Sequence, residues 1–382
     1  MNEAFSSNEG PSLAALRSAW VTVNLRAIAN NVRALRRWLS PHTHLMAVVK
    51  ADGYGHGSLA VAQTAISAGA DWIAVATVSE GIRLRQTGTK NPLLLLSLLH
   101  PDAYETAIAN ALQLTVSSAE ALETISRVAT AMGLAANVHL KIDTGMTRIG
   151  APIEDLPALV KLATTLPDLL LLGISTHLAC AENTATESTE WQLAQFQEAL
   201  TAAALPPSLL RHAANSAATL YYPHSHWDMV RPGLMIYGIT PSPARSMPFP
   251  LEPALSVYAR VVQVREVSAG IAVGYGWRYT TPCPTRLAIL PIGYADGLPR
   301  ALSGHAQVLL HGRHVPIVGT ISMDQCIIDV GRLAVSIGDE AVLLGQQGAE
   351  RIGVEEWAAH AQTIPYEIVC GLGRRLPKLF LR

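Results

Sequence analysis

Residues 44–57 read HLMAVVKADGYGHG and contain the unit from which the fold can be predicted. Its first six residues are mostly apolar and predict a buried strand, while the lysine and three glycines behind them predict a turn before a helix. The same succession of apolar run, turn and helix-length segment recurs along the chain, which indicates strand-helix units around a parallel sheet. The apolar runs are 44–49, 72–76, 92–97, 113–117, 138–142, 172–176, 210–214 and 227–230.

Eight such runs are the number that closes an α/β barrel. They span roughly 190 residues, near the short end of the range for eight-stranded barrels. We therefore expect an α/β fold, an eight-stranded TIM-like barrel followed by a C-terminal, mostly β domain. An open doubly wound sheet is the structural alternative.

The segments outside the repeat suggest the domain boundaries. We expect a flexible leader at 1–18, a barrel domain at 19–240 and a β domain at 241–382, with the proline-rich stretch 240–253 as a linker. The alternating strand 20–25 precedes the barrel runs, and we expect it to pair with the β domain. The expected β-domain strands are 256–267, 285–291, 306–310, 314–318, 325–329 and 340–344.

Composition narrows the class of partner. The chain has 382 residues, 49% of them hydrophobic and 15% charged, so it can bury a large core and is not disordered. Its net charge of −1 gives no basic field for nucleic acid or an anionic membrane, and a small-molecule partner is expected. No apolar run approaches the roughly 20 residues that span a bilayer. The first basic residue is Arg17, whereas a secretory signal begins with a basic patch, so we expect a cytoplasmic protein.

The four cysteines lie far apart in the sequence. We expect reduced core thiols and no metal, because the spacing His177-x-x-Cys180 has no second pair of ligands to complete a site. The other three are Cys283, Cys326 and Cys370.

Polar residues follow several of the predicted strands, where a barrel places its catalytic groups. Lys50 ends the first run, and a partly desolvated lysine beside a glycine loop is suited to a Schiff base. Lys141 lies near the end of the fifth run and Arg148 follows that run, while His177 follows the sixth. Each has an ordinary alternative, as a solvent-directed lysine, a surface arginine or a core histidine, and their joint placement on one rim favours a site.

The last two runs end in groups that suit a phosphate. Asn215 and Ser216 follow the seventh run, and Arg231, Gly233 and Leu234 follow the eighth. Barrels of this kind commonly bind phosphate at these two loops, through hydroxyl groups and the amides at a helix start.

Taken together, these motifs resemble the alanine racemase family, pyridoxal 5′-phosphate enzymes with an α/β barrel and a C-terminal β domain. The resemblance covers nearly the whole chain. Residues 47–57 (AVVKADGYGHG) are similar to the family's cofactor-lysine signature. The C-terminal half adds GYG at 274–276, GYADG at 293–297, SMD at 322–324 and TIPYE at 363–367.

The resemblance implies a two-base racemase that makes D-alanine for peptidoglycan. Lys50 is implied as the lysine that carries the cofactor and as the base for the D isomer, and Tyr275 as the base for the L isomer. Two bases are needed because a proton leaves one face of the substrate and another returns to the opposite face. His177 and Arg148 are implied beside the Tyr275 phenol, and Arg231 at the pyridine nitrogen of the cofactor.

Further residues are implied in supporting roles. The residues implied to bind the cofactor phosphate and ring are Tyr54, His177, Asn215, Ser216, Gly233, Leu234 and Tyr366. Arg148 and Met323 are implied to bind the substrate carboxylate, and Lys141, Tyr294 and Asp324 to support the site. Lys141 matches a lysine that is often carbamylated in the family. Because β-domain residues reach the partner's barrel in this family, the resemblance also implies a homodimer with shared active sites.

Three departures and three alternatives qualify the comparison. Thr320, Glu182 and Ser322 replace an arginine, an aspartate and a cysteine found in family members, which concerns substrate entry and rate. A serine or broader-specificity racemase differs only in pocket polarity. A pyridoxal-phosphate carrier would lack the β domain, and a decarboxylase would need an acidic partner for the pyridine nitrogen where Arg231 stands.

Overall fold

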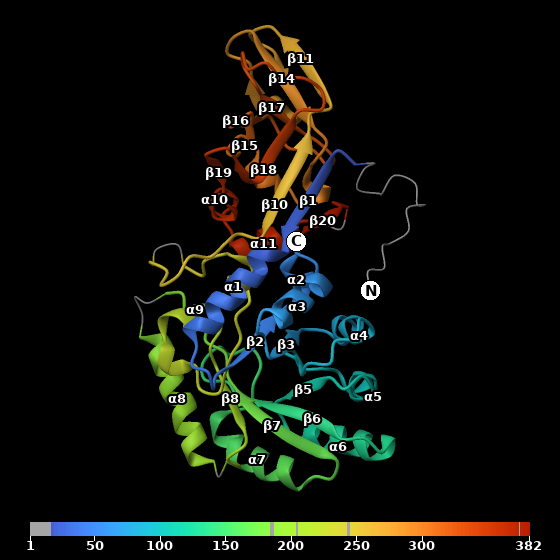
Figure 1. The fold of residues 1–382 in the computed structure, drawn as a ribbon, viewed down its shortest axis with the longest axis vertical. Helices are drawn as coiled ribbons and strands as arrows, with labels where there is room; N and C mark the ends of the chain where they lie inside the picture. Colours follow the sequence, from blue (N-terminus) through green and yellow to red (C-terminus); the bar gives the residue numbers. More distant parts are fainter. Residues whose placement is uncertain (1–16, 184–186, 204, 243–244, 374) are drawn as a thin grey trace. The chain divides into compact units, whose positions relative to one another are not determined.

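The computed structural model describes residues 17–183, 187–203, 205–242, 245–373 and 375–382 (Figure 1). These residues form two compact units. The barrel unit is Ala27–Glu252, and the β unit combines Pro253–Arg382 with the segment that ends at Arg26. Most of the expected leader, residues 1–16, lies outside the described residues.

A parallel eight-stranded sheet forms the centre of the barrel unit, in the order β8-β7-β6-β5-β4-β3-β2-β9. The strands are β2 (His44–Val48), β3 (Trp72–Val75), β4 (Leu93–Leu95), β5 (Gln113–Val116), β6 (Ala136–Lys141), β7 (Leu169–Ser175), β8 (Leu210–His212) and β9 (Met229–Val230). Backbone bonds join its two ends, because Asp228 N donates to Arg211 O at 3.1 Å and Arg231 N to Ala214 O at 2.9 Å. The predicted barrel is confirmed and the open sheet is wrong.

Helices connect successive strands and surround the sheet (Figure 1). Local signals place their ends: Ser118 caps α6 by accepting from Ala121 N, and Gly133 ends it in the left-handed region at φ 63°. The helices are α1 (Leu25–Trp38), α2 (Lys50–Tyr54), α3 (Ser58–Ser67), α4 (Val78–Gln86), α5 (Tyr104–Ala109), α6 (Ala119–Met132), α7 (Leu156–Thr165), α8 (Ser188–Ala202) and α9 (Ser216–Tyr221). Short 3₁₀ turns are η1 (Pro101–Ala103), η2 (Ile153–Asp155), η3 (Pro223–Ser225) and η4 (Leu234–Tyr237).

The β unit contains a mainly antiparallel sheet that includes the start of the chain. β1 (Ala19–Asn24) pairs antiparallel with β10 (Leu255–Arg260) and parallel with β20 (Lys378–Leu381). The other strands are β11 (Gln263–Val267), β12 (Ala272–Val273), β13 (Tyr279–Thr280), β14 (Thr285–Leu290), β15 (Gln307–Leu310), β16 (Arg313–Val318), β17 (Cys326–Asp329), β18 (Glu340–Gln347) and β19 (Glu350–Ile352). Two helices, α10 (Val354–His360) and α11 (Pro365–Gly371), and turns η5 (Tyr275–Trp277), η6 (Tyr294–Asp296) and η7 (Arg300–Leu302) complete it.

Two expectations from the sequence are corrected. The single strand expected at 256–267 is two strands, because the chain changes partners at Val261 and Val262, whose amides bond to Asp339 O and Ile289 O. The cysteines are free, but only Cys326 is a buried core thiol, while Cys283 and Cys370 are exposed.

The stretch 240–253 forms no helix or strand in its described part, yet its end is held to the barrel unit. The Asn31 side chain of α1 accepts from Glu252 N at 2.8 Å and donates to Glu252 O at 2.8 Å. In the described part of the chain, no helix is long and apolar enough to cross a membrane.

Candidate functional site

Lys50 begins the turn that follows β2, and this turn has an unusual backbone. Ala51, Asp52 and Tyr54 all have φ between 51° and 52°, the left-handed region that non-glycine residues rarely adopt. Glu80 of α4 accepts from Ala51 N at 2.7 Å, and Asp52 accepts from Ser58 N at 3.0 Å. The strained turn is therefore fixed from both sides, as backbone strain at functional sites commonly is.

Arg231 follows β9 and is buried inside the barrel. Its Nη2 donates to Thr176 O at 2.8 Å and Ala213 O at 2.9 Å, and its Nη1 donates to His212 Nδ1 at 2.8 Å. Burial lowers the pKa of Arg231 to about 10, so the guanidinium remains charged at neutral pH. These bonds use only the Nη atoms, and among the described residues Nε has no protein acceptor.

A group of cations surrounds His177, at the end of the β7 segment. His177 Nδ1 lies 3.3 Å from Arg231 Nη2 and accepts from it, since a guanidinium can only donate. Burial and then the charges of Lys141, Arg231, Arg148 and Lys50 lower the pKa of His177 well below its ordinary value. The structure thus brings these five predicted residues to one end of the barrel.

Lys141 is the last residue of β6 and is buried beside two arginines. Burial, Arg231 and Arg148 lower its pKa well below the ordinary lysine value, so its amine is held toward the neutral form. The loop behind it is ordered around Asp143, which accepts from Gly145 N and Met146 N at 2.8 Å. Burial alone would raise the pKa of Asp143, but these backbone bonds lower it.

The predicted phosphate residues lie together at the starts of α9 and η4. Asn215 caps α9 by accepting from Ala218 N at 3.0 Å, and Ser216 Oγ accepts from Gly233 N at 2.9 Å. The Tyr54 hydroxyl fills the space where a Cβ on Gly233 would stand, 2.6 Å from that position. Leu234 begins η4, where a helix start leaves its amide without an intrahelical acceptor.

The remaining predicted residues belong to the β unit. Tyr275 and Met323 are 73% and 53% exposed in the single chain, and Tyr294 and Tyr366 are also exposed. The loops that carry Tyr294 and Met323 are joined, because Tyr294 N donates to Ser322 O and Ala295 N to Met323 O, both at 3.0 Å. Asp324 accepts from Arg375 Nη2 at 2.7 Å.

The three family departures have definite positions. Thr320 Oγ1 donates to Tyr275 O at 2.8 Å, so the threonine holds the backbone of the tyrosine turn. Ser322 Oγ donates to Gln325 O at 2.7 Å, inside the loop that carries Met323. Glu182 lies exposed after His177 and its loop.

Several residues around the site were missed in the sequence. Gln192 of α8 donates to His177 O at 3.2 Å and accepts from Ala179 N at 2.8 Å. His212 bonds to Arg231 and continues to His139 and Gln113. Each is a single polar residue within a helix or strand pattern, and no motif distinguishes it; only the glycine at 173, which leaves room beside His139, gives a signal.

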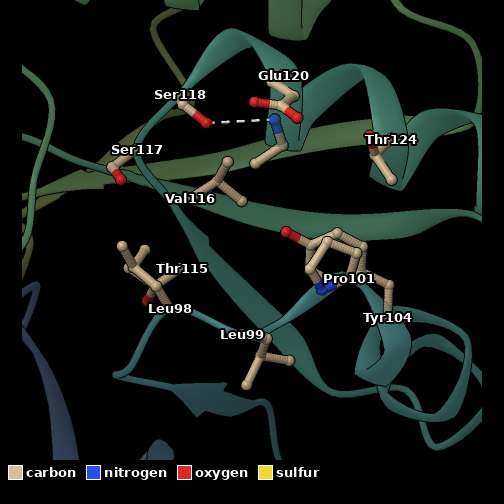
Figure 2. Close-up of a pocket in the computed structure, with 11 residues that line it drawn as sticks. Leu98, Leu99, Pro101, Tyr104, Thr115, Val116, Ser117, Ser118, Glu120 and Thr124 are labelled. Atoms are coloured by element: carbon tan, nitrogen blue, oxygen red, sulfur yellow. Dashed lines mark hydrogen bonds between the residues drawn. The ribbon is translucent and has the colours of Figure 1, made fainter.

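The barrel unit also contains a separate cavity of about 230 Å³, and Figure 2 shows the residues that line it. It lies between the segment after β4, with Leu98, Leu99 and Tyr104, and the end of β5, with Ser117 and Ser118. None of the predicted site residues is among the residues that line it. This cavity is therefore distinct from the group of predicted residues at the cationic end of the barrel.

Three features at the cationic end of the barrel match three chemical groups of pyridoxal 5′-phosphate. A lysine stands at a strand end, a buried arginine keeps Nε without a described protein acceptor, and hydroxyls and helix-start amides gather around Gly233. An aldehyde, a ring nitrogen and a phosphate match these three features in turn.

Comparison with known proteins gives matches over almost the whole chain. The family model for the alanine racemase N-terminal domain matches residues 23–241, and the model for its C-terminal domain matches residues 254–380. The alanine racemase of Symbiobacterium thermophilum is 43% identical over 369 residues, which cover 96% of this chain and 97% of that protein.

Solved structures agree with the sequence matches. The alanine racemase of Streptomyces lavendulae, a D-cycloserine producer, has a TM-score of 0.91 at 38% identity and covers 98% of both chains. A histidine racemase from Leuconostoc mesenteroides subsp. sake has a TM-score of 0.89 at 31% identity, covering 96% of this chain and 98% of that chain. The same fold thus serves a racemase named for another amino acid.

Proposed function

Since the chain belongs to the alanine racemase family, we propose that it interconverts L-alanine and D-alanine, with pyridoxal 5′-phosphate as its cofactor. The observation that carries the proposal is the cationic end of the barrel, where Lys50, Lys141, Arg148, His177 and Arg231 converge. Lys50, Arg148 and Arg231 are the cations of this group, while the pKa values of Lys141 and His177 are lowered toward their neutral forms. Cations gathered in a partly buried site favour an anionic ligand. The cofactor phosphate and the substrate carboxylate are anions of this kind.

The barrel unit supplies the residues that hold the cofactor. Lys50 binds its aldehyde carbon, and Tyr54, Ser216 and the amides of Gly233 and Leu234 bind its phosphate. Asn215 orders the start of α9 through its cap, and Tyr366 is a further phosphate ligand. Bound there, the cofactor draws electrons away from the α-carbon of the amino acid, which makes the α-hydrogen acidic.

Arg231 donates Nε–H to the ring nitrogen of the cofactor. A guanidinium that stays charged can donate a proton in a hydrogen bond but cannot accept one, so the ring nitrogen remains neutral. His212, Thr176 O and Ala213 O hold the guanidinium in place. Held in this way, Arg231 would favour racemisation over transamination, because it would give the ring nitrogen of the bound cofactor no proton.

Two bases on opposite faces move the proton. Lys50 takes or returns the proton on the face of the D isomer, and Tyr275 does so for the L isomer. Arg148 and the Met323 amide bind the substrate carboxylate, while Tyr294 narrows the entry and Asp324 supports the Met323 loop. Thr320 supports this assignment because it fixes the backbone of the Tyr275 turn at 2.8 Å.

Lys141 is proposed to carry a carbamate. Its amine is held toward the neutral form between Arg231 and Arg148, and a neutral amine is the form that reacts with carbon dioxide. The carbamate turns a neutral amine into an anion that attracts Arg148.

We further propose a cytoplasmic homodimer in which each site takes Tyr275 from the second copy. The free cysteines of the described residues suit a reducing compartment, and D-alanine made there would supply peptidoglycan. The high exposure of Tyr275, Tyr294 and Met323 in the single chain supports a shared site.

The proposal is tested by the substrate range of the purified holoenzyme. L-alanine, L-serine and L-histidine are offered separately, and the formation of each D isomer is followed by chiral chromatography. We expect kcat/KM to be greatest for L-alanine. A greater value for L-serine or L-histidine, or no racemisation of L-alanine, contradicts the proposal.

A further inference from the structure

A continuous line of buried polar side chains crosses the barrel from Arg231 to the amino end of β5. Arg231 Nη1 lies 2.8 Å from His212 Nδ1, His212 Nε2 lies 3.0 Å from His139 Nδ1, and His139 Nε2 lies 2.9 Å from Gln113 Oε1. All four residues are buried, and every ring nitrogen of the two histidines is used. Barrel interiors are ordinarily filled with branched apolar side chains. Burying a line of polar side chains there costs free energy of folding, which suggests that the line has a role.

The direction of every bond in this line follows from Arg231. A guanidinium only donates, so His212 Nδ1 must carry the lone pair and His212 Nε2 the hydrogen. His139 Nδ1 must then accept, which leaves the hydrogen on His139 Nε2 and requires an acceptor at residue 113. The amide oxygen of Gln113 is that acceptor, so both imidazoles are neutral and have one allowed tautomer.

The fold makes room for the line at a single glycine. Gly173 on β7 stands in register between His139 on β6 and Leu210 on β8. A Cβ at residue 173 would lie 2.5 Å from His139 Nδ1 and 2.8 Å from Leu210 O. A larger residue would therefore occupy the space in which His139 reaches His212. Trp72 packs edge-on against the His139 ring, with centroids 5.6 Å apart, and holds it from another strand.

We propose that Gln113 is a positioning residue that, through His139 and His212, fixes the orientation in which Arg231 presents Nε–H to the site. This inference rests on the proposed function for the role of Arg231, whereas the tautomers depend only on the chain itself. Without an acceptor at 113, His139 can move its hydrogen to Nδ1. Two N–H groups would then face each other at the contact with His212, so the His212 ring would lose the acceptor that fixes it and would hold Arg231 Nη1 less firmly.

The test measures tautomers and rates on the full chain. Long-range ¹H–¹⁵N spectra of the imidazole rings are recorded at neutral pH, with and without pyridoxal phosphate, for the wild type and three variants. Gln113→Met keeps the side-chain length without the acceptor, and Gln113→Glu restores an acceptor oxygen. Thr115→Val is the matched control, because Thr115 is buried two residues along β5 and bonds to Leu95 O outside the line.

We expect both histidines of the wild type to carry hydrogen on Nε2 only, with or without cofactor. Gln113→Met should give a second, Nδ1-protonated form of His139 and lower kcat roughly 10-fold, the lower end of the cost of losing an outer-shell partner. Gln113→Glu should restore the single tautomer of His139. Thr115→Val should change neither the imidazole spectra nor kcat.

Other outcomes separate the two claims. An Nδ1 hydrogen on His139 or His212 of the wild type overturns the inference, even if no variant folds. A folded Gln113→Met protein with an unchanged His139 spectrum and an unchanged kcat also overturns the inference. The expected tautomers in a protein that does not racemise alanine would leave the line intact and refute the proposed function instead.

Discussion

The barrel unit and the β unit present their candidate residues in opposite ways. In the barrel unit, Arg231 and His212 are buried and bonded to neighbours within the unit. In the β unit, Tyr275 is 73% exposed and Met323 is 53% exposed, although their loops are well bonded through the backbone. The difference is consistent with the proposal that the barrel unit holds the cofactor, while the β unit offers side chains to the site of a second copy.

The largest expected effect in the barrel unit is the loss of Lys50. Lys50→Ala should abolish attachment of the cofactor and lower racemisation by at least 10²–10⁴-fold, roughly the contribution of one acid-base group. Borohydride reduction followed by peptide mapping checks the attachment. Tyr275→Phe in the β unit is the contrast, because it should retain cofactor on Lys50. Cofactor found on another lysine would contradict the assignment.

Replacing the buried cation should cost more stability than breaking an exposed ion pair. Arg231→Glu removes donors from His212, Thr176 O and Ala213 O, and it should lower the free energy of unfolding by about 3–5 kcal/mol. Pyridoxamine phosphate should also accumulate, since a carboxylate favours a protonated ring nitrogen. Urea unfolding and chromatography of the released cofactor measure these two effects.

Asp324→Asn in the β unit serves as its control. Asp324 meets Arg375 at an exposed site, so its loss should leave the unfolding energy almost unchanged. Equal destabilisation by the two substitutions would remove the distinction between a prepared barrel and an open β surface.

Mild acid should weaken the barrel unit through its buried histidines. Burial keeps the pKa of His139 at about 3, and the pKa values of His177 and His212 are also lowered by burial and nearby cations. In the unfolded chain these rings take up protons below about pH 6.5, so the unfolded state binds more protons than the folded state. Between pH 6.5 and pH 5, the free energy of unfolding should therefore fall by up to about 1.4 kcal/mol per pH unit for each buried histidine.

Urea unfolding at the two pH values measures this slope. His139→Gln should reduce this slope by the contribution of one histidine. Hydrogen exchange by peptide should show that the loss of protection lies in the barrel strands. An unchanged stability between the two pH values would contradict burial of neutral imidazoles.

The smallest effect concerns a close contact in the phosphate region. Gly233→Ala places a Cβ 2.6 Å from the Tyr54 hydroxyl and should cost about 1–3 kcal/mol of stability, together with weaker cofactor binding. Adding Tyr54→Phe removes the obstructing oxygen and should recover most of the stability. Gly371→Ala in the β unit is the control, since its Cβ would meet no atom within 4 Å. Failure of the double variant to recover would place the strain elsewhere.

The sequence predicted the barrel because apolar runs and turns repeat along the chain, and each of the eight runs overlaps a strand between β2 and β9. The β unit was harder to predict. The change of partner at Val261 has no turn residue to mark it, and the two-residue strands β12 and β13 are too short to show alternation.

The candidate site likewise contains residues that the sequence could predict and residues that it could not. Lys50, Arg231 and Gly233 lie at strand ends. An α/β barrel places its catalytic and binding groups there, so the position of these residues in the sequence pattern indicates a site. Gln113 begins β5 and His139 lies within β6, where no motif marks either residue, so only the bonds between strands reveal them. The left-handed turn was also hidden, because Ala51 is not a residue type that favours positive φ.

We propose that the barrel unit of one chain forms its active site with Tyr275 of another. The most direct test of this proposal mixes Tyr275→Phe chains with Lys50→Ala chains, after dissociation and exchange that are verified by mass. Each mixed dimer then contains one site with both an intact lysine and an intact tyrosine. We predict that alanine racemisation returns in the mixture, and that Tyr275→Phe alone still exchanges the α-hydrogen of D-alanine, but not of L-alanine, with deuterium. Verified mixed dimers without racemisation would contradict the shared site.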